Sequence, residues 1–131
     1  MEFRKRHWVG MALLTVIAAC HSHKTPQATQ QDVDAAKQEA QQAVAQARIE
    51  ATKDVKSALK TGGGNPRDVA LAKATAAYDI AMIKAEGDHT VASEKCQTLQ
   101  ASMVQACKDQ ADAVYEKAKV TAKAARSARL Q

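Results

Sequence analysis

The chain has 131 residues, with 19 Lys and Arg against 14 Asp and Glu, and it contains one Trp, two Tyr and one Phe. So few large side chains exclude a thick hydrophobic core, and the length allows one small domain at most. The net charge of +5 is mildly basic and does not make the chain a polyelectrolyte.

The first 19 residues have the layout of a secretory signal peptide. A short basic segment, residues 1–7, precedes an apolar run from Trp8 to Ala19. A membrane-spanning helix needs about 20 apolar residues, so this shorter run favours a cleaved signal over a retained anchor. Cleavage after Ala19 would lower the net charge from +5 to +3, because residues 1–19 hold three basic residues and one acidic residue.

The end of this run, Ile17-Ala18-Ala19-Cys20, resembles the lipobox of bacterial lipoproteins, in which an aliphatic residue and two small residues precede a cysteine. The resemblance implies cleavage before Cys20, lipidation of its thiol, and stable membrane anchoring through several acyl chains. His21 stands where an Asp would favour inner-membrane retention, which implies an outer-membrane location facing the periplasm. The alternative is a plain signal peptide with an Ala-type cleavage site.

The number of cysteines supports lipidation. The chain has three cysteines, and an odd thiol in an exported protein needs an explanation. Lipidation of Cys20 would leave Cys96 and Cys107 as a pair that an oxidising compartment can join in a disulfide.

Residues 20–30 are polar and without periodicity, which predicts a flexible tether. Residues 31–60 contain no Gly or Pro and are mostly good helix formers, so they predict a long helix. Its apolar stripe repeats every eleven residues and consists of Val33, Val44 and Val55, of Ala36, Ala47 and Ala58, and of Ala40 and Ala51. Eleven residues complete three turns, so this stripe should run nearly straight, and its small side chains allow a partner helix to approach closely.

Residues 61–66 contain three consecutive glycines followed by Asn65 and Pro66, which predicts a hinge. Gly62 can close the first helix in a left-handed conformation, while Asn65 and Pro66 suit the start of a second helix, 66–96. One face of that helix carries Val69, Ala72, Ala76, Ile80 and Ile83. The segment 87–90 contains a glycine and predicts a kink or a short interruption.

The spacing of Cys96 and Cys107 leaves two arrangements open. On an unbroken helix these residues would lie about 16 Å apart, whereas a disulfide needs Cα atoms within about 7 Å. Ser102 and Gln105 have the spacing of a capping box, which could open a third helix over 103–128. This favours a disulfide-clasped helical hairpin; the alternative is a continuous helix whose cysteines pair between protomers.

The same region carries a second resemblance. Glu94-Lys95-Cys96, ten further residues, Cys107-Lys108 and an Ala/Lys-rich run through Ala118-Lys119 resemble a group of uncharacterised small exported helical proteins of proteobacteria. Those proteins usually carry Gly-Asn or Gly-Asp between the cysteines, where this chain has Ala101-Ser102. The resemblance covers the last third to half of the chain and implies secretion and a disulfide, with no established activity.

After Glu116 the chain has no acidic residue and ends in a basic segment that contains Lys117, Lys119, Lys123, Arg126 and Arg129. Positive charge at a helix C-terminus interacts favourably with the helix dipole, so a solvated end is the simplest interpretation. The sharper hypothesis is binding to anionic lipid head groups or cell-wall polymers. Nucleic acid is not an expected partner, because an exported protein rarely meets it.

We find no pattern typical of a catalytic, cofactor or metal site. His21 and His23 supply too few ligands for a closed metal site, and His89 has no nucleophile beside it. We therefore expect an all-α, non-enzymatic protein without a cofactor, in which residues 31–131 form a single helical region. The expected function is a structural or protein-interaction role as a membrane-anchored envelope lipoprotein that self-associates through its helix stripes. The alternative is a stress-related periplasmic binding or chaperone-like module.

Overall fold

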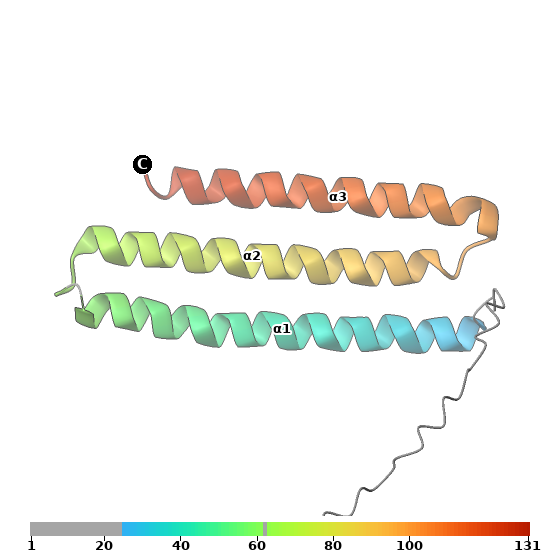
Figure 1. Ribbon diagram of the computed structural model, residues 1–131, viewed down its shortest axis with the longest axis horizontal. Coiled ribbons are helices and arrows are strands. Elements are labelled where there is room, and N and C mark those ends of the chain that lie inside the picture. The colour runs from blue at the N-terminus through green and yellow to red at the C-terminus, as the bar shows by residue number, and fades with distance from the viewer. Residues whose placement is uncertain (1–24, 62) are drawn as a thin grey trace, which may run out of the picture.

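The structure, a computed structural model, describes residues 25–61 and 63–131. These residues form three long helices, α1 (Pro26–Thr61), α2 (Pro66–Cys96) and α3 (Ala101–Ala128), so the predicted all-α fold is confirmed. Figure 1 shows the helices side by side, with α2 in the middle and α3 ending short of the turn between α1 and α2. The predicted signal peptide and Cys20 lie outside the described residues.

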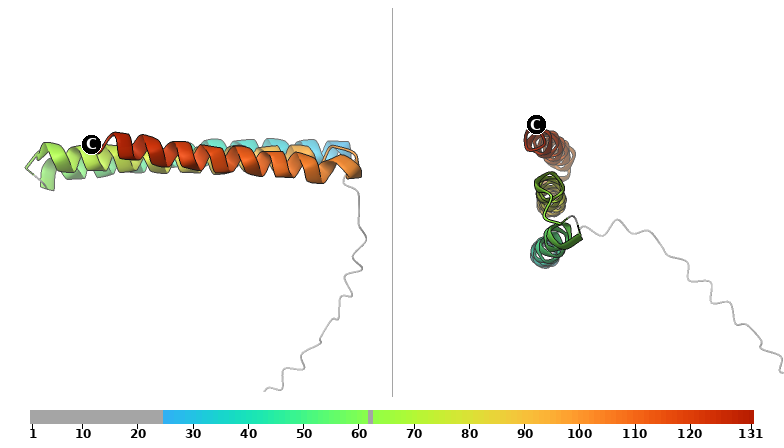
Figure 2. Two further views of the ribbon diagram at one scale, coloured as in Figure 1. Left: turned by 90° about the horizontal axis from the view of Figure 1, so that it is seen from above. Right: turned by 90° about the vertical axis from the view of Figure 1, so that its left-hand side faces the viewer.

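The three helices form a single flat layer. Seen end-on in Figure 2, they stand in one row and do not enclose a common core. Within the described residues α2 packs against both neighbours, whereas α1 and α3 make no contact with each other. Each broad face of the layer is therefore left without a covering helix in this part of the chain.

Helix α1 begins earlier than the composition predicts. The Thr25 hydroxyl accepts a hydrogen bond from the Ala28 amide at 3.2 Å, which is a typical N-cap bond, and Pro26 occupies the first helical position. Thr29 is buried, and its hydroxyl donates to the Thr25 carbonyl. The prediction of a tether was therefore wrong for residues 26–30, while residues 20–24 lie outside the described part.

The eleven-residue stripe of α1 packs on α2 of the same chain. Val33, Ala36 and Ala47 are buried, and Ala40 lies against Gly87 so closely that a Cβ added to Gly87 would be 2.5 Å from the Ala40 Cβ. The helix continues through Gly87 to Cys96, so the predicted kink at 87–90 is wrong. This glycine allows close helix approach, and the backbone there remains helical.

The turn between α1 and α2 forms as predicted. Asn65 caps α2, its side-chain oxygen accepting from the Arg67 amide at 3.0 Å, and Pro66 follows in the first turn. Gly63 and Gly64 have φ of 59° and 75°, which glycine adopts without steric cost. Gly62, to which we assigned the left-handed conformation, lies outside the described residues.

Between α2 and α3 the chain reverses over residues 97–100. Cys96 and Cys107 are joined by a disulfide with their Cα atoms 5.6 Å apart, so the alternative of one continuous helix is wrong. The reversal contains no glycine, and no described non-glycine residue has a positive φ. Within it the Thr98 hydroxyl donates to the Lys95 carbonyl at 2.8 Å.

Helix α3 starts without the predicted capping box. Gln100 is its N-cap residue and makes no side-chain capping bond. Gln105, which we expected to reach back to the start of the helix, instead donates to Asp109 one turn later, at 2.8 Å. The disulfide, which holds the second turn of α3 against the end of α2, offers a physical reason why this start needs no cap.

Candidate interaction surface

The five basic residues near the C-terminus do not form one surface. Lys119 lies 4.7 Å from the centre of the Tyr115 ring and pairs with Glu116. Arg126 lies over Tyr78 of α2, 5.4 Å from the ring centre, and its Nη2 donates to Thr75 at 3.4 Å. The remaining three, Lys117, Lys123 and Arg129, are exposed. Two of the five side chains therefore serve packing within the chain.

Two charged groups have pKa values displaced by neighbours on their own helix. The hydrogen bond from Lys119 to Glu116 raises the pKa of Lys119. The pKa of Asp34 is lowered, because its carboxylate accepts hydrogen bonds first from Lys37 at 3.0 Å and then from Gln30 at 3.1 Å. Both shifts favour the charged forms, so these residues are ionised at neutral pH.

His89 has partners that the sequence analysis missed. Its Nε2 lies 2.6 Å from Oδ1 of Asp112 on α3, and its ring stacks on Tyr115 with ring centres 5.0 Å apart. The cysteine pair is the sequence signal for this contact. His89 precedes Cys96 by seven residues and Asp112 follows Cys107 by five, so an antiparallel hairpin closed at the cysteines brings His89 and Asp112 together. Among the described residues, no group of three or more His, Cys, Asp or Glu is placed to hold a metal ion.

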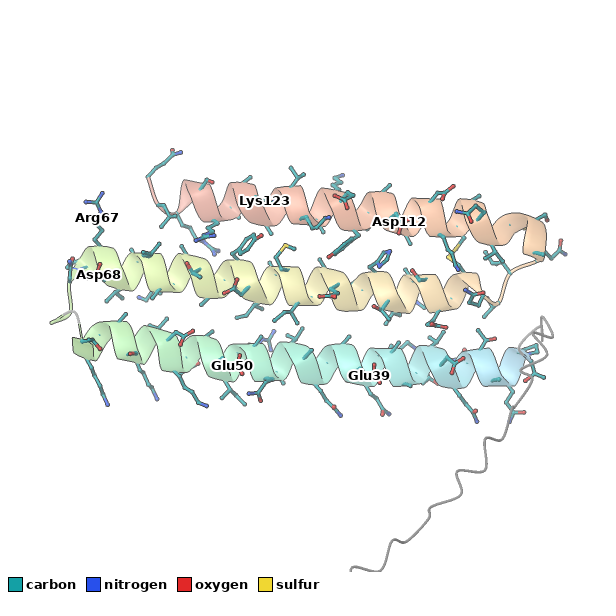
Figure 3. The ribbon with its side chains drawn as sticks, viewed as in Figure 1. Glu39, Glu50, Arg67, Asp68, Asp112 and Lys123 are labelled. Carbon is teal, nitrogen blue, oxygen red and sulfur yellow. A yellow bond between two sulfur atoms is a disulfide. The ribbon has the colours of Figure 1, made fainter. Side chains whose placement is uncertain are left out.

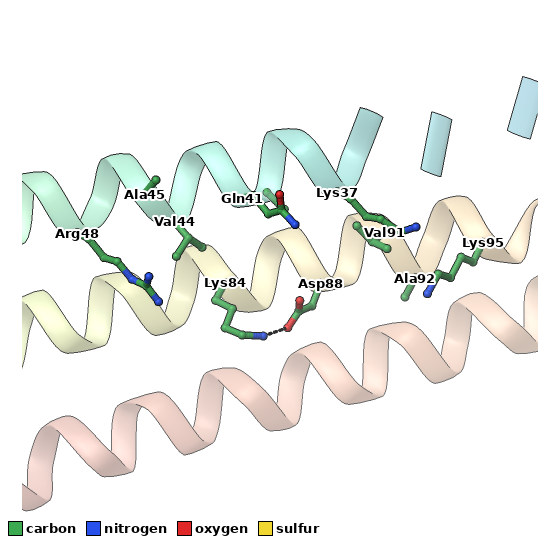
Figure 4. Close-up of a pocket in the computed structure, with 11 residues that line it drawn as sticks. Lys37, Gln41, Val44, Ala45, Arg48, Lys84, Asp88, Val91, Ala92 and Lys95 are labelled. Carbon is green, nitrogen blue, oxygen red and sulfur yellow. Dashed lines mark hydrogen bonds and ion pairs between the residues drawn. The ribbon is translucent and has the colours of Figure 1, made fainter. Parts of the chain in front are cut away.

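One broad face carries a basic groove between α1 and α2. It consists of two depressions of about 620 and 570 Å³ that meet at Arg48. Six cationic side chains line them, namely Lys37, Arg48, Lys56, Lys73, Lys84 and Lys95, and Asp88 is the one acidic residue in the lining. Figure 4 shows the first depression, with the Lys84–Asp88 ion pair of 2.5 Å at its edge.

The floor of the basic groove is made of small apolar residues such as Ala40, Val44 and Val91. On α2 the cations recur every eleven residues, at 73, 84 and 95, and on α1 Lys37 and Arg48 have the same spacing. This period was the available sequence signal. The apolar stripe of α1 has the same period as these charged residues.

A smaller apolar groove of about 340 Å³ runs between α2 and α3. It shares Asp88, Ala92 and Lys95 with the basic groove, so both grooves open on the same broad face. Val114, which is 62% exposed, and Tyr115 line its α3 side.

On the opposite broad face, the part formed by α1 and α2 is acidic. A shallow groove of about 170 Å³ between α1 and α2 is lined by Glu39 and Glu86 and by no Lys or Arg. Helical periodicity places Glu50, Asp68 and Asp79 on the same side, since residues seven or eleven apart share a helix face. Figure 3 labels three of these acids, Glu39, Glu50 and Asp68. We call Glu39, Glu50, Asp68, Asp79 and Glu86 the acidic face.

A comparison with known proteins finds no matching family model, no matching curated protein and no matching solved structure. The lipobox and the resemblance to small exported helical proteins therefore stay predictions. No helix within residues 25–61 and 63–131 combines the length and apolar character needed to cross a bilayer.

Proposed function

We propose that this protein is a lipid-anchored, non-catalytic component of the bacterial envelope with a structural or protein-interaction role. The open layer carries the interaction part of the proposal. Its buried apolar residues are mostly alanine and lie along the two helix contacts. Two long faces therefore stay available to a macromolecular partner, and no domain core occupies them.

Part of the stripe of α1, through which we expected self-association, is covered within the chain. Its residues Val33, Ala36 and Ala47 are buried against α2 of the same chain. An oligomer of this folded chain must therefore use the faces of the layer or its edges.

The anchor part of the proposal rests on Cys20 and the lipobox before it. Helix α1 begins at Pro26, only six residues after Cys20. Six extended residues reach about 20 Å, so lipidation would hold the layer close to the membrane surface, with α1 entering from that side. An outer-membrane location facing the periplasm fits His21 after the lipidated cysteine.

The test of the anchor is fractionation of cells that express the full chain, followed by intact mass measurement with and without reductant. We expect the wild type in the membrane fraction with the mass of a cleaved, acylated chain that contains one internal disulfide. Cys20→Ser should lose acylation and leave the membrane fraction. A wild-type mass without acyl chains, or a Cys20→Ser chain that stays with the membrane, contradicts the proposal.

A second candidate function, a chaperone-like module, is supported by the apolar groove beside α3. Exposed apolar surface of this kind can bind unfolded chains. The protein should then slow aggregation of a heat-unfolded client, and Val114→Asp in the groove should weaken this effect. Val120→Asp is the matched control, because Val120 is 66% exposed and does not line the groove. Equal effects of the two substitutions would remove this candidate.

A further inference from the structure

Over α1 and α2 the two broad faces of the layer carry opposite charge and follow the same helical period. The basic groove presents six cations on one face, and the acidic face presents five carboxylates on the other. Complementary faces on one molecule allow a second copy to bind, with the basic face of one on the acidic face of the next. We propose that copies of this protein stack face to back, which deepens the proposed structural role by naming the partner.

The sequence spacing of the charges matches such a stack. Three exposed cations are each followed, two residues later, by an exposed carboxylate: Lys37 by Glu39, Arg48 by Glu50, and Lys84 by Glu86. Two residues turn an α-helix by about 200° and raise it by about 3 Å. Each cation and its carboxylate therefore lie at nearly the same height on opposite faces. A copy translated perpendicular to the layer, with its helices parallel, meets all three cations with its own carboxylates.

The faces are large enough for a stable contact. Helices of 36, 31 and 28 residues are about 40–55 Å long at 1.5 Å per residue. At interaxial distances of about 8–10 Å, three of them present a face of roughly 1,200 Å². A standard protein interface buries about 800 Å² per partner. Single exposed ion pairs contribute little, so the contact depends on several pairs that form in one register.

The exposed pairs within each chain do not prevent this contact. Lys37 binds Asp34, Lys84 binds Asp88, and Gln46 donates to Glu50, all between residues on the same helix. Their side chains are largely exposed and can exchange partners. Because the stacking operation is a translation, it does not close, and the assembly grows as an open row. Every copy then begins α1 at the same edge, which suits chains anchored to one membrane.

Charge reversal in the full chain tests the stack. Lys37→Glu with Arg48→Glu makes the α1 part of both faces acidic, and Glu39→Lys with Glu50→Lys makes the α1 part of both faces basic. In sedimentation velocity the wild type should grow with concentration and shrink in high salt. Each variant alone should stay small, because like charges then meet along α1. An equal mixture should assemble again, because the α1 part of one variant is acidic on both faces and that of the other is basic. Helicity by circular dichroism must be unchanged in both variants.

Lys53→Glu with Lys60→Glu is the matched control, since it makes the same charge change outside the basic groove. This control should assemble like the wild type. Variants that assemble as well as the wild type, or a mixture that stays dispersed, overturn the proposal. So does a monomeric wild type that instead binds anionic phospholipid vesicles through the groove, with loss of binding in Lys37→Glu, Arg48→Glu.

Zero-length carbodiimide cross-linking checks the register. In a mixture of unlabelled and isotope-labelled chains, an amide between Lys37 and Glu39 should join a labelled to an unlabelled peptide. Cross-links confined to one chain would contradict the stack. The outcome is separate from that of the anchor test: an acylated but monomeric chain overturns the stack alone, and an unacylated chain that stacks overturns the anchor alone.

Discussion

The contact between Gly87 and Ala40 makes the sharpest prediction about the fold. In a free helix, replacing Gly by Ala stabilises by about 1 kcal/mol. Here the new Cβ would be 2.5 Å from the Ala40 Cβ and 3.3 Å from its Cα, so α1 and α2 would have to move apart. Overpacking of this kind costs about 1–3 kcal/mol. We therefore expect Gly87→Ala to lower the free energy of unfolding by about 1–2 kcal/mol, taking the upper part of that range against the helix gain.

Urea unfolding followed by circular dichroism measures this change, with the disulfide intact in all samples. Ala40→Gly is the matched partner, because it removes the Cβ that the new methyl group meets. By itself it should cost about 1 kcal/mol in helix propensity. In a double-mutant cycle the two substitutions together should cost less than the sum of their separate costs, because removing the Ala40 Cβ makes room for the methyl group added at position 87. If Gly87→Ala raises the stability by about 1 kcal/mol, as propensity alone predicts, the close packing of α1 on α2 is refuted.

Three further predictions concern the turns and the N-terminal part of α1. Replacing both Cys96 and Cys107 by Ala should lower the free energy of unfolding, because the disulfide restricts the unfolded chain; for a loop this short the loss is about 3 kcal/mol. Reduced wild type should match this variant, and an unchanged urea midpoint would contradict the prediction. The Asp34 carboxylate should titrate below 3.8, and Lys37→Ala should raise its pKa, as NMR can measure. Because folding lowers the pKa of Asp34, its ionised carboxylate stabilises the fold fully above the pKa of the unfolded chain, and this contribution is lost as the pH falls through the pKa of the folded chain. An Asp34 carboxyl that titrates at or above 3.8 would contradict the prediction. Asn65→Ala should destabilise by about 1 kcal/mol and Asn65→Gly by only a few tenths, and equal losses in thermal unfolding would argue against the cap.

Local patterns in the sequence predicted several elements well. The glycine run before Asn65 and Pro66 marks the turn between α1 and α2, because each of these residue types favours one backbone conformation. Where the pattern is weak, the prediction failed. Thr25 and Pro26 start α1 inside the predicted tether, and Gly87 continues a helix where the composition predicted a kink.

The candidate surfaces needed the tertiary structure. The helical period shows which charged residues share a face of one helix, such as 73, 84 and 95, but not which helix lies beside that face. His89 and Asp112 meet only because the disulfide sets the register of α2 against α3. Their spacing from Cys96 and Cys107 marks them as a pair only once these cysteines are known to close a hairpin.

The sequence by itself determined that the chain is helical, where its first turn lies and which side chains form the stripe of α1, since propensity, capping and period act over a few neighbouring residues. The tertiary structure alone decided that part of this stripe is covered within the chain and that three helices lie in an open row. That arrangement depends on how closely small residues such as Ala40 and Gly87 approach across two helices, a contact between residues 47 positions apart. The open row of helices also places the basic groove and the acidic face on opposite sides of the layer.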